Sequence, residues 1–151
     1  MKVPRIYPDT SIFGGYFDEE FAFKSRLLFE MVHQGRAVLV ISDILVNELA
    51  PSPPRVRSLL AGLPRQAVEL VFADDESEHL RDAYLRAGVV GPGHHRDAHH
   101  IALATVAQAD ILVSWNFKHI VHYDKIRMFN AVNLKEGYPQ IDIRSPREVV
   151  P

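Results

Sequence analysis

Residues Asp97 to Asn116, DAHHIALATVAQADILVSWN, decide how the rest of the chain is arranged. The alanine-rich first part favours a helix, because alanine has the highest helix propensity and its small side chain lets a helix lie close to a sheet. The run Ile111 to Val113 is short, rich in branched side chains and without polar alternation, which is typical of a strand covered on both faces. The stretch therefore predicts half of an αβ unit.

The two ends of this stretch are expected at the same edge of a sheet. A helix that precedes a parallel strand runs opposite to it, so the first turn of the helix lies where the strands end. Asp97 begins the predicted helix, and Asn116 follows the predicted strand. Open α/β sheets carry their sites at that edge, so both residues are candidates for a functional site.

Length and composition are typical of one globular domain. The chain has 151 residues, enough for a single domain over residues 1–151, with 47% hydrophobic and 24% charged residues. The start, MKVPRIYPDTSIF, lacks the continuous apolar core of a signal peptide, and no apolar run is long enough to span a membrane. With no cysteine to form disulfides, the chain fits a reducing compartment. We therefore expect a cytoplasmic protein.

Charge and cysteine count also limit the chemistry. The absence of cysteine excludes a thiolate nucleophile or a thiolate metal site. The formal net charge of −2 provides no broad electrostatic attraction to nucleic acid. Binding of RNA would therefore depend on a local basic patch or on metal ions.

Strand and helix patterns alternate along the whole chain, which predicts an α/β fold with a mostly parallel sheet and helices on both faces, three layers in all. Residues 11–16, with two glycines, look like a turn. The expected strands are 3–7, 37–41, 67–72, 111–113 and an edge strand 141–143. The expected helices cover 18–35, 44–50, 52–64, 74–86, 97–107 and a last amphipathic helix ending before residue 137.

This topology selects a few of the 19 acidic residues as site candidates. Asp9 follows the first strand, and Glu48 lies in the helix after the second. With Asp97 and Asn116, they are expected at one edge. Asp110 precedes the fourth strand, roughly 13 Å from its other end at about 3.3 Å per residue, and is predicted to be a turn residue. The acidic residues at 74–76 are better explained as helix caps.

Three carboxylates at one edge indicate a metal site. They repel one another unless a cation neutralises them or one carboxyl stays protonated. Mg²⁺ and Mn²⁺ prefer such oxygen ligands, and either ion can hold a phosphodiester and activate water for in-line attack. The residues alone thus predict phosphodiester hydrolysis at Asp9, Glu48 and Asp97. Each of these residues taken singly also has a plain structural explanation, as a turn residue, a solvated helix residue and a helix cap, respectively.

The chain resembles the PIN-domain nucleases, especially the VapC-like toxins of toxin–antitoxin pairs, in four pieces that follow one another in order over nearly its whole length. The resemblance implies a five-stranded sheet of order 3-2-1-4-5 and Mg²⁺- or Mn²⁺-dependent cleavage of RNA. It also implies homodimers and inhibition by a small antitoxin protein. The matching pieces are YPDTSIF, ISDILVNELA, RDAHHIALATVAQADILVSWNFKHIV and FNAVNLKEGYPQIDIRSP.

Residue by residue, the resemblance places the first three acidic positions of the family on Asp9, Glu48 and Asp97, as catalytic and metal-binding residues. Thr10 and Ser11 match the polar pair after the first aspartate of the family, and Ser114 matches its serine or threonine near the fourth acidic position. Apart from the resemblance, Lys118 is a further candidate for support of the substrate.

Asn116 departs from the family pattern, in which many members carry an aspartate at this position. An amide can still offer a carbonyl oxygen or orient a water, so Asn116 stays among the catalytic candidates. The loss of one negative charge should weaken metal binding, most of all for a second ion. Single-metal catalysis, slow catalysis and loss of activity all remain open.

Four histidines surround Asp97, at positions 94, 95, 99 and 100. Adjacent residues on a helix point about 100° apart, so these pairs do not form an i, i+4 metal clamp, and adventitious metal binding is the better interpretation. His99 and His100 either reach a phosphate or pack in the core. Lys118, His119 and His122 form either a positive rim for RNA or a solvated loop. Trp115 either stacks on a base or, as we favour, packs at the turn.

Three functions are compatible with these residues. The first is a metal-dependent endoribonuclease, the toxin of a toxin–antitoxin pair. The second, motivated by Asn116, is a catalytically impaired module that binds RNA or an antitoxin. The third is another Mg²⁺-using α/β protein, a phosphatase or receiver domain, which is disfavoured because the first strand lacks the DxD motif of the former and the acidic pair of the latter.

Overall fold

Five parallel strands form one sheet in the order β3-β2-β1-β4-β5 in the computed structural model, which describes residues 2–151. All four neighbouring pairs are parallel. The α/β class and the strand order are thus confirmed, and each strand begins within two residues of its predicted start. The strands are β1 (Arg5–Pro8), β2 (Val38–Ser42), β3 (Val68–Val71), β4 (Ile111–Val113) and β5 (Asp142–Arg144).

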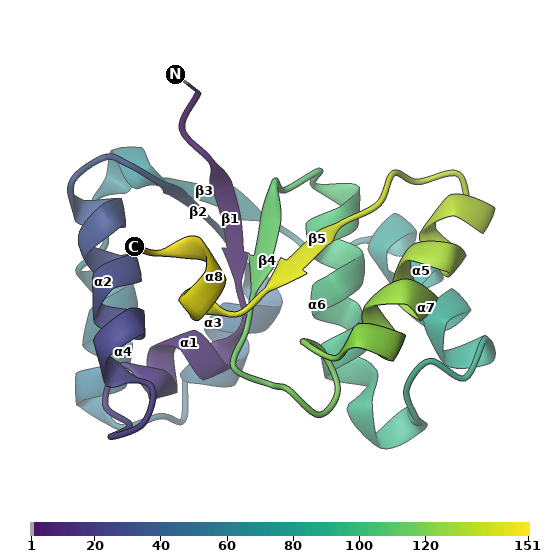
Figure 1. Cartoon of the computed structure of the whole chain (residues 1–151), viewed down its shortest axis with the longest axis horizontal. Helices are drawn as coiled ribbons and strands as arrows, with labels where there is room; N and C mark the ends of the chain where they lie inside the picture. The colour runs from purple at the N-terminus through teal and green to yellow at the C-terminus, as the bar shows by residue number, and fades with distance from the viewer. Residues whose placement is uncertain (1) are drawn as a thin grey trace.

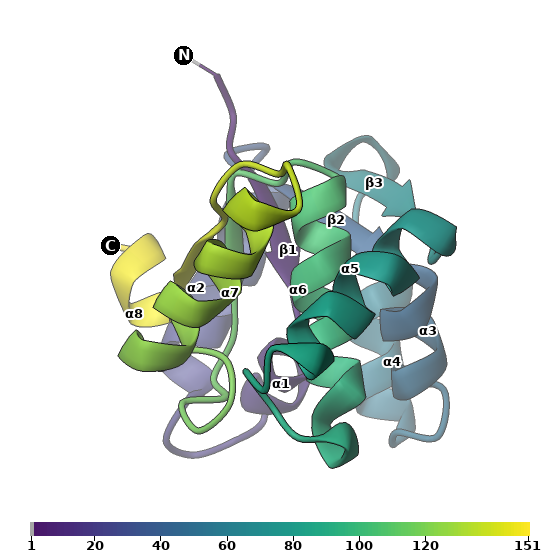
Figure 2. The ribbon, with the colours of Figure 1, turned by 90° about the vertical axis from the view of Figure 1, so that its right-hand side faces the viewer.

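Helices cover both faces of the sheet, as Figures 1 and 2 show. Helices α5, α6 and α7 lie on one face and α1, α2 and α4 on the other, whereas α3 follows directly from the end of β2. Two 3₁₀ turns, Arg65–Ala67 and Pro92–His94, precede β3 and α6. The helices are α1 (Thr10–Gly15), α2 (Ala22–His33), α3 (Asp43–Leu49), α4 (Pro54–Ala61), α5 (Asp75–Arg86), α6 (His95–Val106), α7 (Tyr123–Lys135) and α8 (Pro146–Val149).

The core has two halves, one on each face of the sheet. Because successive side chains of a strand point to opposite faces, Ile6 belongs to one half and its neighbour Tyr7 to the other, and both are fully buried. Apolar residues of α6, such as Ile101, complete the half that contains Tyr7. This face carries most of the side chains described below.

The chain enters three helices differently from the sequence-based expectation. The segment predicted as a turn is helix α1, because the Asp9 side chain accepts a hydrogen bond from the Ser11 N–H and so caps it. Helix α2 begins at Ala22 rather than at Asp18, since the Asp18 carboxylate instead accepts from the backbone N–H of Glu20 and forms a turn. Helix α6 begins at His95, which makes Asp97 a first-turn residue and not its cap.

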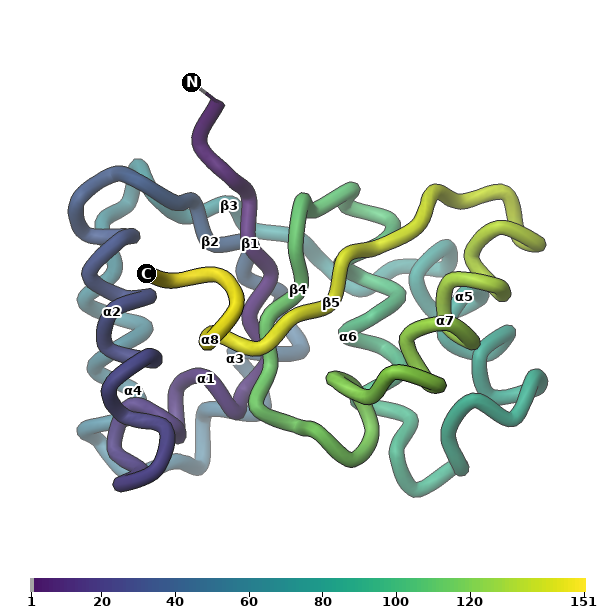
Figure 3. Tube along the Cα trace, viewed as in Figure 1, coloured from purple at the N-terminus to yellow at the C-terminus, as the bar shows by residue number. Residues whose placement is uncertain are grey.

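The C-terminal end of the chain lies beside α2, as the trace in Figure 3 shows. The short helix α8 had not been expected from the sequence. It starts at Pro146 after Ser145, which forms a capping box with Glu148. Lys24 Nζ of α2 donates to the carbonyl oxygen of Pro151 over 2.7 Å, which holds the last residues against the domain. Within residues 2–151, no helix is long and apolar enough to cross a membrane.

Gly15 allows the segment after β4 to pack closely against α1. A Cβ atom at this position would lie 2.8 Å from two ring atoms of Trp115 and 2.9 Å from the Ser25 hydroxyl. Trp115 is buried, stacks on Phe21 with ring centroids 4.3 Å apart, and donates its indole N–H to Ser25 Oγ. Packing rather than base stacking is thus confirmed as the role of Trp115, and a side chain at position 15 would displace it.

Candidate active site

Asp9 lies at the carboxyl end of β1, where two serines hold its carboxylate. Ser114 Oγ, from the segment after β4, donates to Oδ2 over 2.6 Å, and the Ser11 hydroxyl donates to Oδ1. Both hydroxyls also accept backbone hydrogen bonds, Ser11 from Trp115 N at 2.8 Å and Ser114 from Asn116 N at 2.9 Å. These bonds fix the orientation of the Asp9 carboxylate between the two central strands.

Burial raises the pKa of the Asp9 carboxyl, because the charged form loses its hydration. The hydrogen bonds from Ser11 and Ser114 and the nearby His100 oppose this rise in pKa, whereas the charge of Asp97 adds to it. Asp9 and Asp97 are thus close enough for their charges to interact. A cation at this edge would relieve both the desolvation of Asp9 and its repulsion from Asp97.

Glu48 does not face open solvent but meets a histidine of α6. Its Oε1 lies 2.6 Å from His100 Nε2, and the His100 side chain is only 2% exposed. His100 Nδ1 lies 2.6 Å from the hydroxyl of Tyr7, which in turn lies 2.8 Å from Ser42 Oγ. Ser42 caps α3 by accepting from Leu45 N. A continuous hydrogen-bonded chain thus connects β1, β2, α3 and α6 behind the acidic edge.

The direction of each bond in this chain follows from the donors available. A carboxylate only accepts, so His100 Nε2 carries the hydrogen that points to Glu48. In a neutral ring Nδ1 then accepts from Tyr7, and the Tyr7 oxygen accepts from Ser42. Burial raises the pKa of the Tyr7 hydroxyl above its usual value, which keeps this group protonated as a donor.

Asp97 and Asn116 face each other at the open side of this edge. Asn116 Nδ2 donates to Asp97 Oδ2 over 3.4 Å, and His94 Nδ1 lies 3.6 Å from the same oxygen. Asn116 Oδ1 accepts from the backbone N–H of His119 at 2.9 Å, which fixes the amide with its NH₂ group toward Asp97. Asn116 therefore presents a donor where an aspartate would present a second negative charge.

The other candidate residues at this edge, Thr10, Lys118 and His119, have fewer contacts with the acidic residues. Lys118 is exposed and Thr10 is half-buried, and neither side chain makes a hydrogen bond to another described residue. The rings of His94 and His119 stack with centroids 3.7 Å apart beside Asp97. Burial and the nearby His94 lower the pKa of His119, which reduces its share of any positive rim.

His99 points away from the acidic edge, toward α5. Its Nε2 lies 3.1 Å from Ser77 Oγ, and its side chain is buried. Burial, followed by the positive charge of Arg81, lowers the pKa of His99 to about 4, so this ring is neutral at pH 7. His99 and His100 both pack, so neither is a free phosphate contact.

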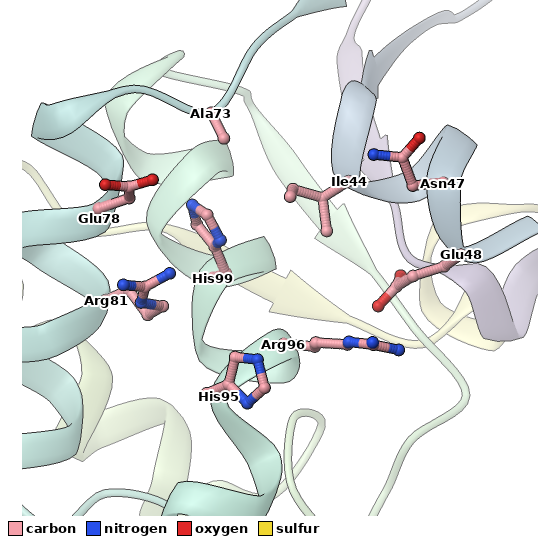
Figure 4. A pocket seen from close by; sticks show the side chains of 9 residues that line it. All are labelled: Ile44, Asn47, Glu48, Ala73, Glu78, Arg81, His95, Arg96 and His99. Carbon is pink, nitrogen blue, oxygen red and sulfur yellow. The ribbon is translucent and has the colours of Figure 1, made fainter.

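A pocket of about 330 Å³ borders the acidic edge between α3, α5 and α6. Figure 4 shows that its lining side chains come from all three helices and that Glu48 is shared with the site described above. Its charged and histidine side chains are Glu48, Glu78, Arg81, His95, Arg96 and His99. The arginines of this pocket had not been singled out from the sequence.

The acidic residues that the sequence had set aside have structural roles. Asp110 Oδ2 accepts from the backbone N–H of Arg5 at 2.7 Å, so it lies at the start of β1, at the opposite edge of the sheet. Asp74 and Ser77 form the capping box of α5. Both interpretations are confirmed. By contrast, no sequence pattern had paired Glu48 with His100, although both were expected near the same edge.

Among residues 2–151, no three His, Asp or Glu side chains surround one point closely enough to hold a metal ion by themselves. The Glu48 carboxylate is hydrogen-bonded to His100, so of the three expected carboxylate ligands only Asp9 and Asp97 are left for a metal ion. This pair still fits an ion such as Mg²⁺, which commonly takes one or two carboxylates and completes its shell with water and substrate phosphate.

No protein-family model matches the chain, and no curated protein sequence matches it. Among solved structures, the chain is similar to a chain in the crystal structure of VapBC2 from Rickettsia felis bound to a DNA fragment from their promoter. The TM-score is 0.55 with 16% sequence identity, over 93% of this chain and 98% of that chain. This likeness, with the strand order β3-β2-β1-β4-β5 and helices on both faces, shows a PIN-like α/β fold.

Proposed function

We propose that the protein is a metal-dependent endoribonuclease that hydrolyses phosphodiester bonds of RNA at the Asp9–Asp97 edge. The observation that carries the proposal is that the buried Asp9 carboxylate and the half-buried Asp97 carboxylate lie at the carboxyl end of the central strands, near enough for their charges to interact. A cation bound at such a place would relieve the repulsion between the two charges. The PIN-like fold is consistent with this chemistry.

Asp9 and Asp97 would hold the Mg²⁺ or Mn²⁺ ion. When bound, such an ion polarises a phosphoryl oxygen and lowers the pKa of a bound water. Ser11 and Ser114 keep Asp9 in one orientation through their two hydrogen bonds. Asn116 holds the loop after β4 and positions Asp97, and His100 fixes the carboxylate of Glu48.

The proposed test measures cleavage of a single-stranded RNA with Mn²⁺ or Mg²⁺. We expect cleavage that EDTA stops, and we expect Asp97→Asn to reduce it by about 100-fold or more, because the variant removes a charge at the reacting phosphate. Asp110→Asn is the matched control, since it makes the same chemical change at the opposite edge. Cleavage that survives Asp97→Asn, or falls equally with Asp110→Asn, contradicts the proposal.

A second candidate function has its own observation. Asn116 directs its NH₂ group at Asp97 and uses its carbonyl oxygen for His119 N–H, so it neutralises part of the repulsion that a cation would otherwise relieve. A site compensated in this way suits a catalytically impaired module that binds RNA or an antitoxin.

The Asn116→Asp variant separates the two functions. The new carboxylate keeps an acceptor for His119 N–H and turns its other oxygen toward Asp97, which creates a demand for a cation. If the wild type is impaired, Asn116→Asp raises metal-dependent cleavage by at least about tenfold, in line with restoring one electrostatic contact. If the wild type is already fully active, the variant gives no such rise, and the binding-module function is excluded.

We further propose that the chain pairs with a small antitoxin and forms a homodimer, as the PIN-like fold and its likeness to a chain of a VapBC2 structure suggest. Light scattering on the purified chain tests the homodimer. A monomer at micromolar concentration would contradict it.

A further inference from the structure

The pocket beside Glu48 has a lining that can recognise a ligand through both donors and acceptors. Arg81 donates only its Nε to Asp82 Oδ1, at 3.0 Å, so within residues 2–151 its terminal NH₂ groups make no other hydrogen bond. Arg96 forms no ion pair with any described residue. Glu78, on the same helix as Arg81, supplies a carboxylate. Such groups are free to bind a ligand.

The rest of the lining gives the pocket its shape. Ile44 from α3 and Ala73, which follows β3, form the apolar part of the lining, as Figure 4 shows. A volume of about 330 Å³ is at the lower end of small-molecule sites, which corresponds to one compact ligand rather than a stacked run of bases. Seven of the nine lining residues are polar or charged, so a ligand would be recognised mainly through hydrogen bonds and charge.

Continuity with the acidic edge indicates what kind of ligand enters. Glu48 lines this pocket and also belongs to the hydrogen-bonded chain behind Asp9. In Figure 4, the Arg96 side chain extends toward Glu48, the residue that the pocket shares with the acidic edge, so this side of the pocket carries a cation. An RNA strand that reaches Asp97 would pass this opening.

We propose that this pocket binds one unpaired guanine nucleotide of a single-stranded RNA, next to the bond that is cut. An arginine pairs with O6 and N7 of guanine more often than with any other base edge, and Arg81 has the free NH₂ groups for it. The Glu78 carboxylate can accept from N1–H and the exocyclic amino group. A base must be unstacked to enter, so the strand is single-stranded here. The proposal rests on the proposed ribonuclease function.

The test measures binding of the mononucleotides 5′-GMP, 5′-AMP, 5′-CMP and 5′-UMP to the whole chain by NMR titration in EDTA, where no cleavage occurs. We expect 5′-GMP to bind at least about fivefold tighter than the others and to shift signals of residues 73, 78, 81 and 96. Arg81→Ala should weaken 5′-GMP at least about fivefold, and Glu78→Gln, which keeps the side-chain shape, should remove the preference for guanine.

Arg86→Ala is the matched control, because Arg86 lies at the exposed end of the same helix and outside this pocket. No binding of 5′-GMP, binding unchanged by Arg81→Ala, or equal binding of 5′-AMP overturns the proposal. Equal competition by inorganic phosphate shows an anion site only and also overturns it. Failure of cleavage with intact 5′-GMP binding counts against the ribonuclease function alone, so the two failures are distinguishable.

Discussion

His99 and His100 are adjacent on α6, yet they serve opposite sides of this helix. His99 faces α5, where its partner is the Ser77 hydroxyl. His100 faces the sheet and α3, where its partners are Glu48 and Tyr7. Both rings are buried, but only His100 binds a carboxylate. One helix thus combines a structural contact with a site contact through two consecutive residues about 100° apart.

The partners of the two histidines also differ in whether they keep other hydrogen bonds when the imidazole is removed. Ser77 Oγ donates to the carbonyl oxygen of Asp74 and accepts from its N–H, both at 3.1 Å, so it stays hydrogen-bonded without His99. Without His100, the Tyr7 hydroxyl keeps its hydrogen bond to Ser42 Oγ. The Glu48 carboxylate has no other hydrogen-bond partner among residues 2–151. Loss of His100 should therefore cost more than loss of His99.

The largest expected effect tests this difference directly. His100→Ala should lower the free energy of unfolding by about 3 kcal/mol, because it leaves the partly buried Glu48 carboxylate without its side-chain partner and leaves the Tyr7 hydroxyl with Ser42 alone. His99→Ala should lower it by less, about 1 to 2 kcal/mol, since the loss of a buried ring is common to both variants but His99→Ala leaves no carboxylate unpaired. Urea unfolding at pH 7.5 measures both. Equal costs, or a larger cost for His99→Ala, would remove the basis of the comparison.

The second prediction concerns how the contribution of His99 to the free energy of unfolding depends on pH. Native His99 has a pKa of about 4, below the value of 6.5 for a solvated ring, so between these values the unfolded chain binds a proton that the native chain does not. Stability from His99 is therefore fully present above pH 6.5 and is lost as the pH falls toward 4. Between pH 7 and pH 4.5 this loss amounts to about 2 kcal/mol.

A variant at position 99 separates the contribution of His99 to the pH dependence of stability from that of the carboxylates, which also titrate over this range. His99→Gln can keep a donor toward Ser77 but does not titrate, so its stability should fall less than that of the wild type over the same pH range. The measurement is urea unfolding of both chains at pH 7 and pH 4.5. Parallel pH curves would mean that His99 is protonated in the native state and that its burial has no such consequence.

The candidate residues could be predicted from the sequence because their place at one edge of the sheet depends only on the topology. Asp9, Glu48, Asp97 and Asn116 each follow or precede a strand in a way that places them at one edge, and Asp110 falls at the other. The strand patterns were sufficient for this, since parallel strands bring their carboxyl ends together.

The contacts between these residues depend on helix rotation and packing, which no local pattern encodes. Glu48 meets His100 only because α3, which follows β2, and α6, which packs on Tyr7 of β1, are rotated so that these two side chains face each other. Helix α1 was missed because Gly14 and Gly15 have low helix propensity, although Asp9 before Thr10 and Ser11 is a recognisable cap. Of the pocket arginines, Arg81 was missed because α5 reads as an ordinary solvated helix.

The smallest effect concerns the hydroxyl that links His100 to the sheet. Tyr7→Phe removes the bonds to His100 Nδ1 and Ser42 Oγ while keeping the ring in the core, so we expect a loss of about 1 kcal/mol in the free energy of unfolding. Tyr84→Phe is the matched control, because Tyr84 is also buried and donates to Asn133, on the α5 and α7 side of α6.

Both tyrosine variants should cost a similar amount of stability, but only Tyr7→Phe should change the site. Without the Tyr7 hydroxyl, the His100 ring loses one of the two hydrogen bonds that fix its orientation, so Glu48 is held less firmly and RNA cleavage should slow by several-fold. Urea unfolding and a cleavage assay on both variants check this. A slower reaction in both, or in neither, would mean that the hydrogen-bonded chain from Ser42 to Glu48 stabilises the fold without positioning the site.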